Sequence, residues 1–203
     1  MNATFWIVGE IIVGIAVLGV LSAVVTAVMV PFLDRVRPMP LRRSAMKSTV
    51  VYESHHGNTA RIARAIAHGL EAAGPVRLAE ASDPTAFEVA GVDLLVVGGP
   101  TEGHGVSQTL RPILNALPPN ALKGASLATF DTRLTWPAFL AGSAAHGIAK
   151  ILQAKGARLV IAPESFLVTG MKEVHLVEGE VERVGGWAER LLAKATESLP
   201  QAG

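Results

Sequence analysis

Two kinds of hydrophobic pattern follow one another along the chain. Residues 11–30 are apolar without a charged side chain, whereas from residue 48 onward short apolar runs alternate with stretches of helical periodicity. A helix of about 20 residues spans about 30 Å, the thickness of a bilayer's hydrocarbon core. The first pattern therefore predicts a membrane-spanning helix within residues 1–33. The second predicts a separate α/β domain over residues 48–203.

The second pattern is typical of a parallel sheet covered by helices. Short apolar runs expected for buried strands lie at residues 48–52, 76–79, 93–97, 126–130 and 157–161. Helical spacing of apolar residues lies at 59–73, 110–117, 137–155 and 185–194. Such alternation builds a parallel sheet through right-handed crossovers, and ligands bind beyond the carboxyl ends of its strands. We therefore expect function in the loops 53–59, 98–107 and 131–138.

Basic residues directly follow the apolar segment. The stretch 34–47 carries one acidic residue, Asp34, against Arg35, Arg37, Arg42, Arg43 and Lys47. Because Lys and Arg favour the cytoplasmic side of a span, Met1 is predicted outside and the α/β domain in the cytoplasm. Prolines make residues 34–47 an extended linker that can also contact anionic lipid. A cleaved signal peptide would need a basic start, and a buried helix of a soluble core would need a polar edge.

Composition removes several classes of function. The chain has no cysteine, which excludes disulfides, thiolate zinc sites and cysteine-ligated iron–sulfur clusters. From residue 48 onward, 13 basic and 15 acidic residues give a net charge of −2 without a basic stripe, which gives no support for nucleic-acid binding. His68, His146 and His175 are scattered singly, so no metal site is predicted. No Gly-x-Ser-x-Gly elbow or zincin motif is present, and no catalytic residue is assigned.

The loop after the first predicted strand has the features of a phosphate-binding site. It reads Ser54, His55, His56, Gly57, Asn58 and Thr59, and it opens a helix. Helix starts offer unpaired N–H groups and the positive end of the dipole. The absence of Lys and of Gly-x-Gly-x-x-Gly argues against nucleoside triphosphates and dinucleotides. The alternative is that Ser54 and Asn58 merely cap the helix.

Residues 50–66, VVYESHHGNTARIARAI, resemble the flavodoxin signature at each of its fixed positions. In that signature two apolar residues and an aromatic precede a hydroxyl residue, and a small residue, Thr, Ala and an aliphatic follow. The resemblance extends over about residues 48–195. It implies a flavodoxin-like, doubly wound, five-stranded parallel sheet of strand order 2-1-3-4-5, with FMN as the cofactor.

The resemblance gives two further loops a role at the flavin ring. The first would pack against the ring and its N5 edge, with Pro100, Thr101, Glu102, Gly103, His104 and Gly105 as candidate contacts. Its glycines allow the backbone to change conformation. His104 would either stack on the ring or be a solvated turn residue. The charge of Glu102 would disfavour an anionic reduced flavin and lower the potential.

The second ring loop supplies the candidates Phe130, Asp131, Thr132, Arg133 and Trp136. Trp136 would stack on the outer ring face, or it would belong to the core or to a membrane face. Asp131 and Arg133 would pair with each other or hold the loop, and Arg133 could also contact a partner or an anionic substrate. Beyond it, residues 165–182 depart from the simplest flavodoxins. Their acidic residues Glu178, Glu180 and Glu182 are predicted to form a solvated turn without chemistry.

These observations predict a membrane-tethered, FMN-binding protein that is either an electron carrier or a small flavin oxidoreductase. The bilayer itself would be one partner. The second would be a redox protein or a quinone-type molecule of the membrane, and the oligomeric state stays open. The alternative from another class is a flavin-free interaction module at the membrane, because the ring loop 98–105 lacks Trp and a fold alone does not set function.

Overall fold

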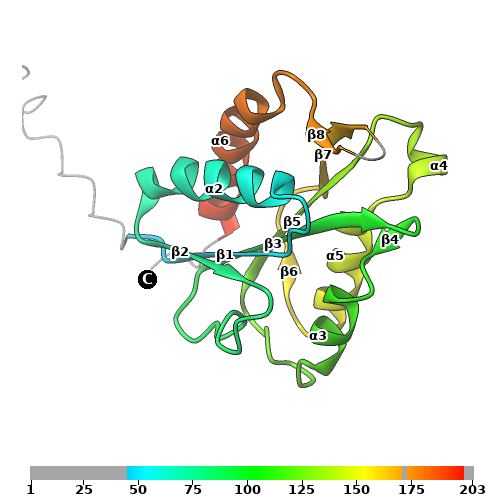
Figure 1. Cartoon of the computed structure of the whole chain (residues 1–203). Coiled ribbons are helices and arrows are strands. Elements are labelled where there is room, and N and C mark those ends of the chain that lie inside the picture. Colours follow the sequence, from blue (N-terminus) through cyan, green and yellow to red (C-terminus); the bar gives the residue numbers. More distant parts are fainter. Residues whose placement is uncertain (1–44, 171–172, 199–203) are drawn as a thin grey trace, which may run out of the picture. The chain divides into compact units, whose positions relative to one another are not determined.

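The computed structural model describes residues 45–170 and 173–198 (Figure 1). The membrane-spanning helix predicted for residues 1–33 and most of the linker 34–47 lie outside the described residues. Within the described part of the chain, no helix combines the length and apolar character that a bilayer crossing requires. Met46 and Lys47, assigned to the linker, belong to the domain. Met46 is buried and donates its N–H to Ala73 at 3.0 Å, and the Lys47 N–H donates to Asp93 at 2.9 Å.

The described chain forms one eight-stranded sheet. Its main path is β2 (Val76–Glu80), β1 (Ser48–Tyr52), β3 (Leu94–Glu102), β5 (Ser126–Leu134), β7 (Glu164–Thr169) and β8 (His175–Leu176). β4 (Gly105–Val106) pairs with β3, and β6 (Arg158–Leu159) pairs with β5. The pairs from β2 to β7 along the main path are parallel, whereas β4 and β8 pair antiparallel. The predicted parallel α/β fold and the order of its first four strands are confirmed.

The fifth position of the sheet differs from the prediction. A single strand over 157–161 was expected, but β6 pairs with the start of β5 and β7 pairs with its end. Pro163 lies between them and has no N–H to donate to a ladder, which accounts for the interruption. The chain then turns back into β8. The prediction of five strands was therefore too low, because it missed the hairpin β7–β8 and the short strand β4.

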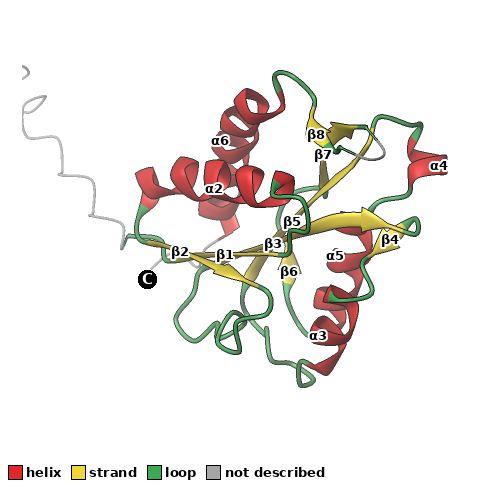
Figure 2. Ribbon diagram, viewed as in Figure 1, coloured by secondary structure: helices red, strands yellow, loops and turns green. Residues whose placement is uncertain are grey.

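Helices cover both faces of the sheet (Figure 2). They are α2 (Asn58–Leu70) with the 3-10 turn η1 (Glu71–Ala73), α3 (Leu110–Ala116), α4 (Ala138–Ala141), α5 (Ala144–Ala154) and α6 (Glu180–Ser198). Alternate strand residues face opposite sides. Val50 and Leu94 pack with α2 and α6, whereas Val51 and Leu95 pack with α3 and α5. Burial on both faces explains the continuous apolar runs of the central strands.

The helix predicted for 137–155 is two helices. Gly142 has a φ of +73° and separates α4 from α5, and Ser143 is the N-cap of α5. A Cβ atom at Gly142 would collide with the carbonyl group of His104. Glycine is therefore required where this segment crosses the turn that follows β3.

The solvated acidic turn predicted for Glu178, Glu180 and Glu182 is confirmed for Glu178, which is exposed in a turn, but Glu180 and Glu182 belong to α6 and only Glu182 of these two is exposed. Glu180 opens α6 and is buried, and its carboxylate accepts the Leu167 N–H at 3.0 Å and the Arg183 guanidinium at 2.6 Å. Arg183 also pairs with Glu164 at 2.7 Å and lies 4.6 Å above the Phe166 ring. The glutamate therefore fastens α6 to β7, through a contact that no local pattern in the sequence reveals.

Candidate functional site

A cleft of about 240 Å³ opens at the carboxyl ends of β1, β3 and β5. The predicted site residues that line it are His55, His56, Asn58, Thr59, Pro100, Thr101, Glu102, Thr132 and Arg133. Lining residues that were not predicted are Leu134, Val168, Gly170 and Val174. The last three come from the β7–β8 hairpin, which the sequence pattern did not indicate. All three predicted loops therefore meet at one edge of the sheet, where doubly wound folds bind their ligands.

The phosphate loop leaves two features without a side-chain partner among the described residues, the start of α2 and the Ser54 hydroxyl. Gly57 precedes α2 with a φ of +79°, and no side chain of the described residues caps this helix. The Ser54 Oγ is buried without a hydrogen-bond partner among the described residues. Asn58 does not cap the helix but donates to the Val174 carbonyl at 2.7 Å. The capping alternative for Ser54 and Asn58 is therefore not what the structure shows.

The start of helix α5 differs from that of α2 in having side-chain partners for its first N–H groups. Its first N–H groups are already taken: Ala144 donates to the Thr101 Oγ1 at 2.9 Å, and Ala145 donates to the Asp131 carboxylate at 2.9 Å. Ser143 also donates to Asp131 at 2.6 Å. A helix start needs partners for its first N–H groups. At α5 the protein supplies them, whereas at α2 no capping side chain does.

A histidine joins the phosphate loop to the turn after β3. The Nδ1 of His55 lies 2.7 Å from the Glu102 carboxylate, and its Nε2 lies 3.2 Å from that of Glu53. Glu53 is 9% exposed and also accepts the Ser107 hydroxyl. Burial lowers the pKa of His55, but the hydrogen bonds and charges of Glu102 and Glu53 outweigh it and leave the pKa raised. Glu53 and Ser107 were missed, although an acidic residue directly after an apolar strand was a visible signal.

The residues of the second ring loop separate into cleft, core and surface. Phe130 is fully buried and packs edge-on against Phe166, so it does not line the cleft. Asp131 holds the start of α5 and does not pair with Arg133. Arg133 donates to the carbonyls of Leu134 and Trp136 at 3.2 and 2.9 Å. Both side chains therefore hold the loop, as one of the alternatives predicted.

The surface part of this loop is apolar. Trp136 is 49% exposed and Phe139 is 84% exposed, so Trp136 does not belong to the core. Of the other ring-loop candidates, Gly103 and His104 form an exposed turn with positive φ, and Gly105 begins β4. His104 fits the turn alternative, since neither it nor its glycine neighbours lines the cleft.

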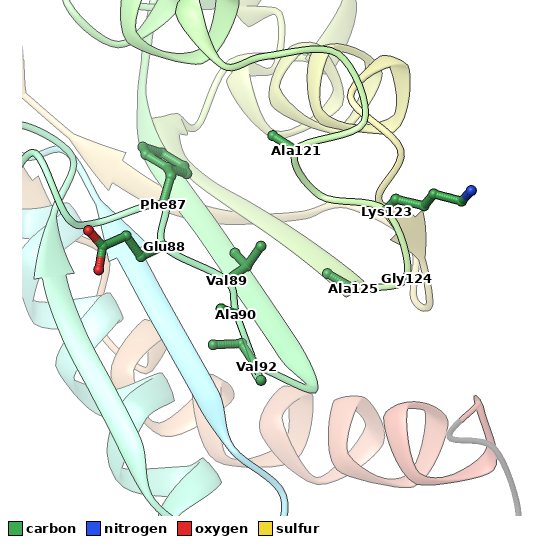
Figure 3. A pocket seen from close by; sticks show the side chains of 10 residues that line it. Phe87, Glu88, Val89, Ala90, Val92, Ala121, Lys123, Gly124 and Ala125 are labelled. Atoms are coloured by element: carbon green, nitrogen blue, oxygen red, sulfur yellow. The ribbon is translucent and has the colours of Figure 1, made fainter.

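A larger hollow of about 620 Å³ lies at the amino ends of β3 and β5. Figure 3 shows its two walls, residues 87–92 and 121–125, with Lys123 extending away from the hollow. Glu88 and Lys123 are its charged lining residues, and the remainder is small or apolar. It lies at the edge of the sheet opposite the helix start of α2. The hollow therefore does not lie at the edge where doubly wound folds bind their ligands.

Comparison with known proteins agrees with this geometry. The flavodoxin family model matches residues 50–187. The chain belongs to the flavodoxin family. Flavodoxin 2 and flavodoxin 1 of Bacillus cereus are 24% and 21% identical, with TM-scores of 0.60 and 0.59, over 75% and 76% of this chain and 99% of theirs. Rubredoxin oxygen:oxidoreductase of Desulfovibrio gigas is 16% identical, with a TM-score of 0.56, over 75% of this chain and 37% of its own. No curated protein matches the chain.

Membership of the flavodoxin family implies FMN as the cofactor. The residues present fit a phosphate group. The uncapped start of α2 and the unpartnered Ser54 hydroxyl both supply donors. A Cβ added at Gly57 would meet no atom within 4 Å, so the space beside this turn is open. Thr59 donates to or accepts from Thr132 at 2.8 Å, which ties the phosphate loop to the second ring loop.

Proposed function

We propose that this flavodoxin-family protein binds FMN in the cleft and carries electrons between partner molecules at a membrane. The contrast between the starts of α2 and α5 carries the proposal, because side chains take the first N–H groups of α5 whereas no side chain of the described residues caps α2. The FMN phosphate would accept hydrogen bonds from the N–H groups of residues 57–60 and from the Ser54 and Thr59 hydroxyls. The turn 100–105 and the segment 130–136 would flank the ring.

When bound, FMN supplies the electron-accepting and electron-donating chemistry. The protein binds and orients it through the phosphate loop, and it sets the charge beside the ring through Glu102. The exposed Trp136, Phe139 and Leu140 follow the second ring loop and offer an apolar contact for a partner. This placement favours a carrier over an enzyme that closes around a small substrate. Saturable turnover of one small substrate would instead identify an oxidoreductase.

The apolar segment 11–30 and the basic residues after it support membrane tethering. We propose a single span with the flavodoxin domain on the cytoplasmic side and a redox protein or quinone-type molecule of the same membrane as partner. Carbonate extraction of membranes followed by protease digestion of right-side-out vesicles tests this arrangement. Release by carbonate, or digestion of the domain from outside, contradicts it.

The cofactor proposal is tested on the full chain purified in mild detergent. We expect a flavin absorption spectrum, or quenching of flavin fluorescence when FMN is titrated into the colourless protein. Gly57→Asp places a carboxylate where the phosphate would bind and should greatly weaken binding, whereas Gly91→Asp, at another glycine of positive φ with open space, should not. A folded protein that ignores FMN would support the flavin-free interaction module.

A further inference from the structure

The contacts of His55 require a proton that neutral histidine cannot supply. Both ring nitrogens lie within hydrogen-bond distance of a carboxylate oxygen, from Glu102 at 2.7 Å and from Glu53 at 3.2 Å. A carboxylate only accepts hydrogen bonds, and a neutral imidazole has one N–H donor. The two contacts are therefore made together when the ring is an imidazolium. The group of three then carries a net charge of about −1, and loss of the proton changes it to about −2.

These contacts join the two loops that would hold opposite ends of the cofactor. His55 belongs to the phosphate loop, and Glu102 ends β3 at the turn expected to face the flavin ring. Glu53 anchors the arrangement because it is buried and also accepts the Ser107 hydroxyl. The titratable or charged groups around His55 are Glu53 from the end of β1, Glu102 from β3, His56 of its own loop and Arg133 from β5 across the cleft.

We propose that His55, as an imidazolium, is a positioning residue. Its contacts with Glu102 and Glu53, here called the clasp, hold the phosphate loop to the turn after β3 and thereby strengthen FMN binding. Loss of its proton removes one of the two contacts and removes the positive charge that offsets the two carboxylates. Both changes disfavour a bound phosphate monoester. The effect on FMN rests on the proposed function, whereas the clasp itself exists in the flavin-free protein.

The direction of the pH dependence follows from the raised pKa of His55. The contribution of the clasp to stability is fully present below pH 6.5, the ordinary value of a histidine, and is lost as pH rises through the higher pKa of the folded state. The second ionisation of a phosphate monoester, near pH 6, acts in the opposite sense because it strengthens binding as pH rises. A variant without the imidazole separates the two effects.

The test compares FMN dissociation constants at about pH 6.5 and pH 9 for the full chain in detergent, the His55→Gln variant and a control. Between these two pH values the FMN affinity of the wild type should fall about threefold to tenfold relative to that of His55→Gln. This is the effect expected from the loss of one partly exposed charged hydrogen bond. His68→Gln is the matched control, since His68 lies 3.2 Å from Glu71 on the exposed surface of α2. It should behave as the wild type. His55→Lys keeps its positive charge over this pH range. It should therefore bind FMN more tightly than His55→Gln and should not show the loss of affinity that the wild type shows as pH rises.

A second measurement does not need FMN. The histidine NMR signal that His55→Gln removes should titrate above its ordinary pH in the flavin-free protein and return toward it in Glu102→Gln. Equal pH dependence of FMN affinity in wild type and His55→Gln would overturn the proposal. Absence of FMN binding at either pH overturns the proposed function instead, and the NMR titration then decides the clasp alone.

Discussion

Ser54→Ala should weaken cofactor binding without lowering the stability of the flavin-free protein. The Ser54 Oγ is buried and has no hydrogen-bond partner among the described residues. Leaving a buried hydroxyl unpaired costs about 1–3 kcal/mol, so its removal should leave the free energy of unfolding of the flavin-free protein unchanged or raise it by about 1 kcal/mol. A hydrogen bond to a charged phosphate is worth about 1.5–3 kcal/mol, so FMN affinity should fall about 10- to 150-fold.

Ser48→Ala provides a matched control at the other end of the same strand. The Ser48 Oγ is also buried without a partner in the described chain, but Ser48 begins β1, whereas Ser54 follows the other end of β1 in the phosphate loop. Denaturant unfolding measures the stabilities, and fluorescence titration measures FMN affinity. Both variants should be at least as stable as the wild type, and only Ser54→Ala should bind FMN weakly. Equal FMN affinity of the two variants would refute the assignment of Ser54 to the phosphate.

Three further predictions concern the surroundings of the cleft. Gly57→Ala places a side chain on a residue whose φ is +79°, and denaturant titrations should show a free energy of unfolding lower by about 1–2 kcal/mol. Unchanged stability would contradict this left-handed conformation of Gly57. Glu102→Gln removes a negative charge from the turn after β3 and should raise the flavin reduction potential in a redox titration. An unchanged potential would show that the charge of Glu102 does not lower it. Arg183→Ala leaves the buried Glu180 without its partner and should cost about 3 kcal/mol, whereas Arg190→Ala, exposed on the same helix, should cost little.

Local sequence patterns predicted the parts of the fold that depend on neighbouring residues. The short, mainly apolar runs located β1, β3 and β5, because strands covered on both faces lack the regular polar alternation of a half-exposed strand. The motif at 50–66 located the phosphate loop and α2 together. Gly142 and Ser143 also carried the local signals of a helix end and a helix start, but the longer periodicity of 137–155 outweighed them in the prediction.

The remaining features depend on residues far apart in the sequence. Glu102 meets His55 across 47 positions, and Asn58 meets Val174 across 116. The hairpin β7–β8 contributes Val168, Gly170 and Val174 to the cleft only because β7 pairs with the end of β5. Contacts of this kind follow from strand order and register, which no single-sequence pattern specifies.

The most direct measurement of the central claim compares FMN with riboflavin, which has the same ring but no phosphate, on the full chain at one pH. If the start of α2 grips the phosphate, FMN should bind at least about 100-fold more tightly than riboflavin, since several charged hydrogen bonds of about 1.5–3 kcal/mol each are lost. Ser54→Ala should reduce the ratio of FMN affinity to riboflavin affinity, because it weakens the binding of FMN alone. Equal affinities for FMN and riboflavin would contradict the assignment of the start of α2 as the phosphate-binding site.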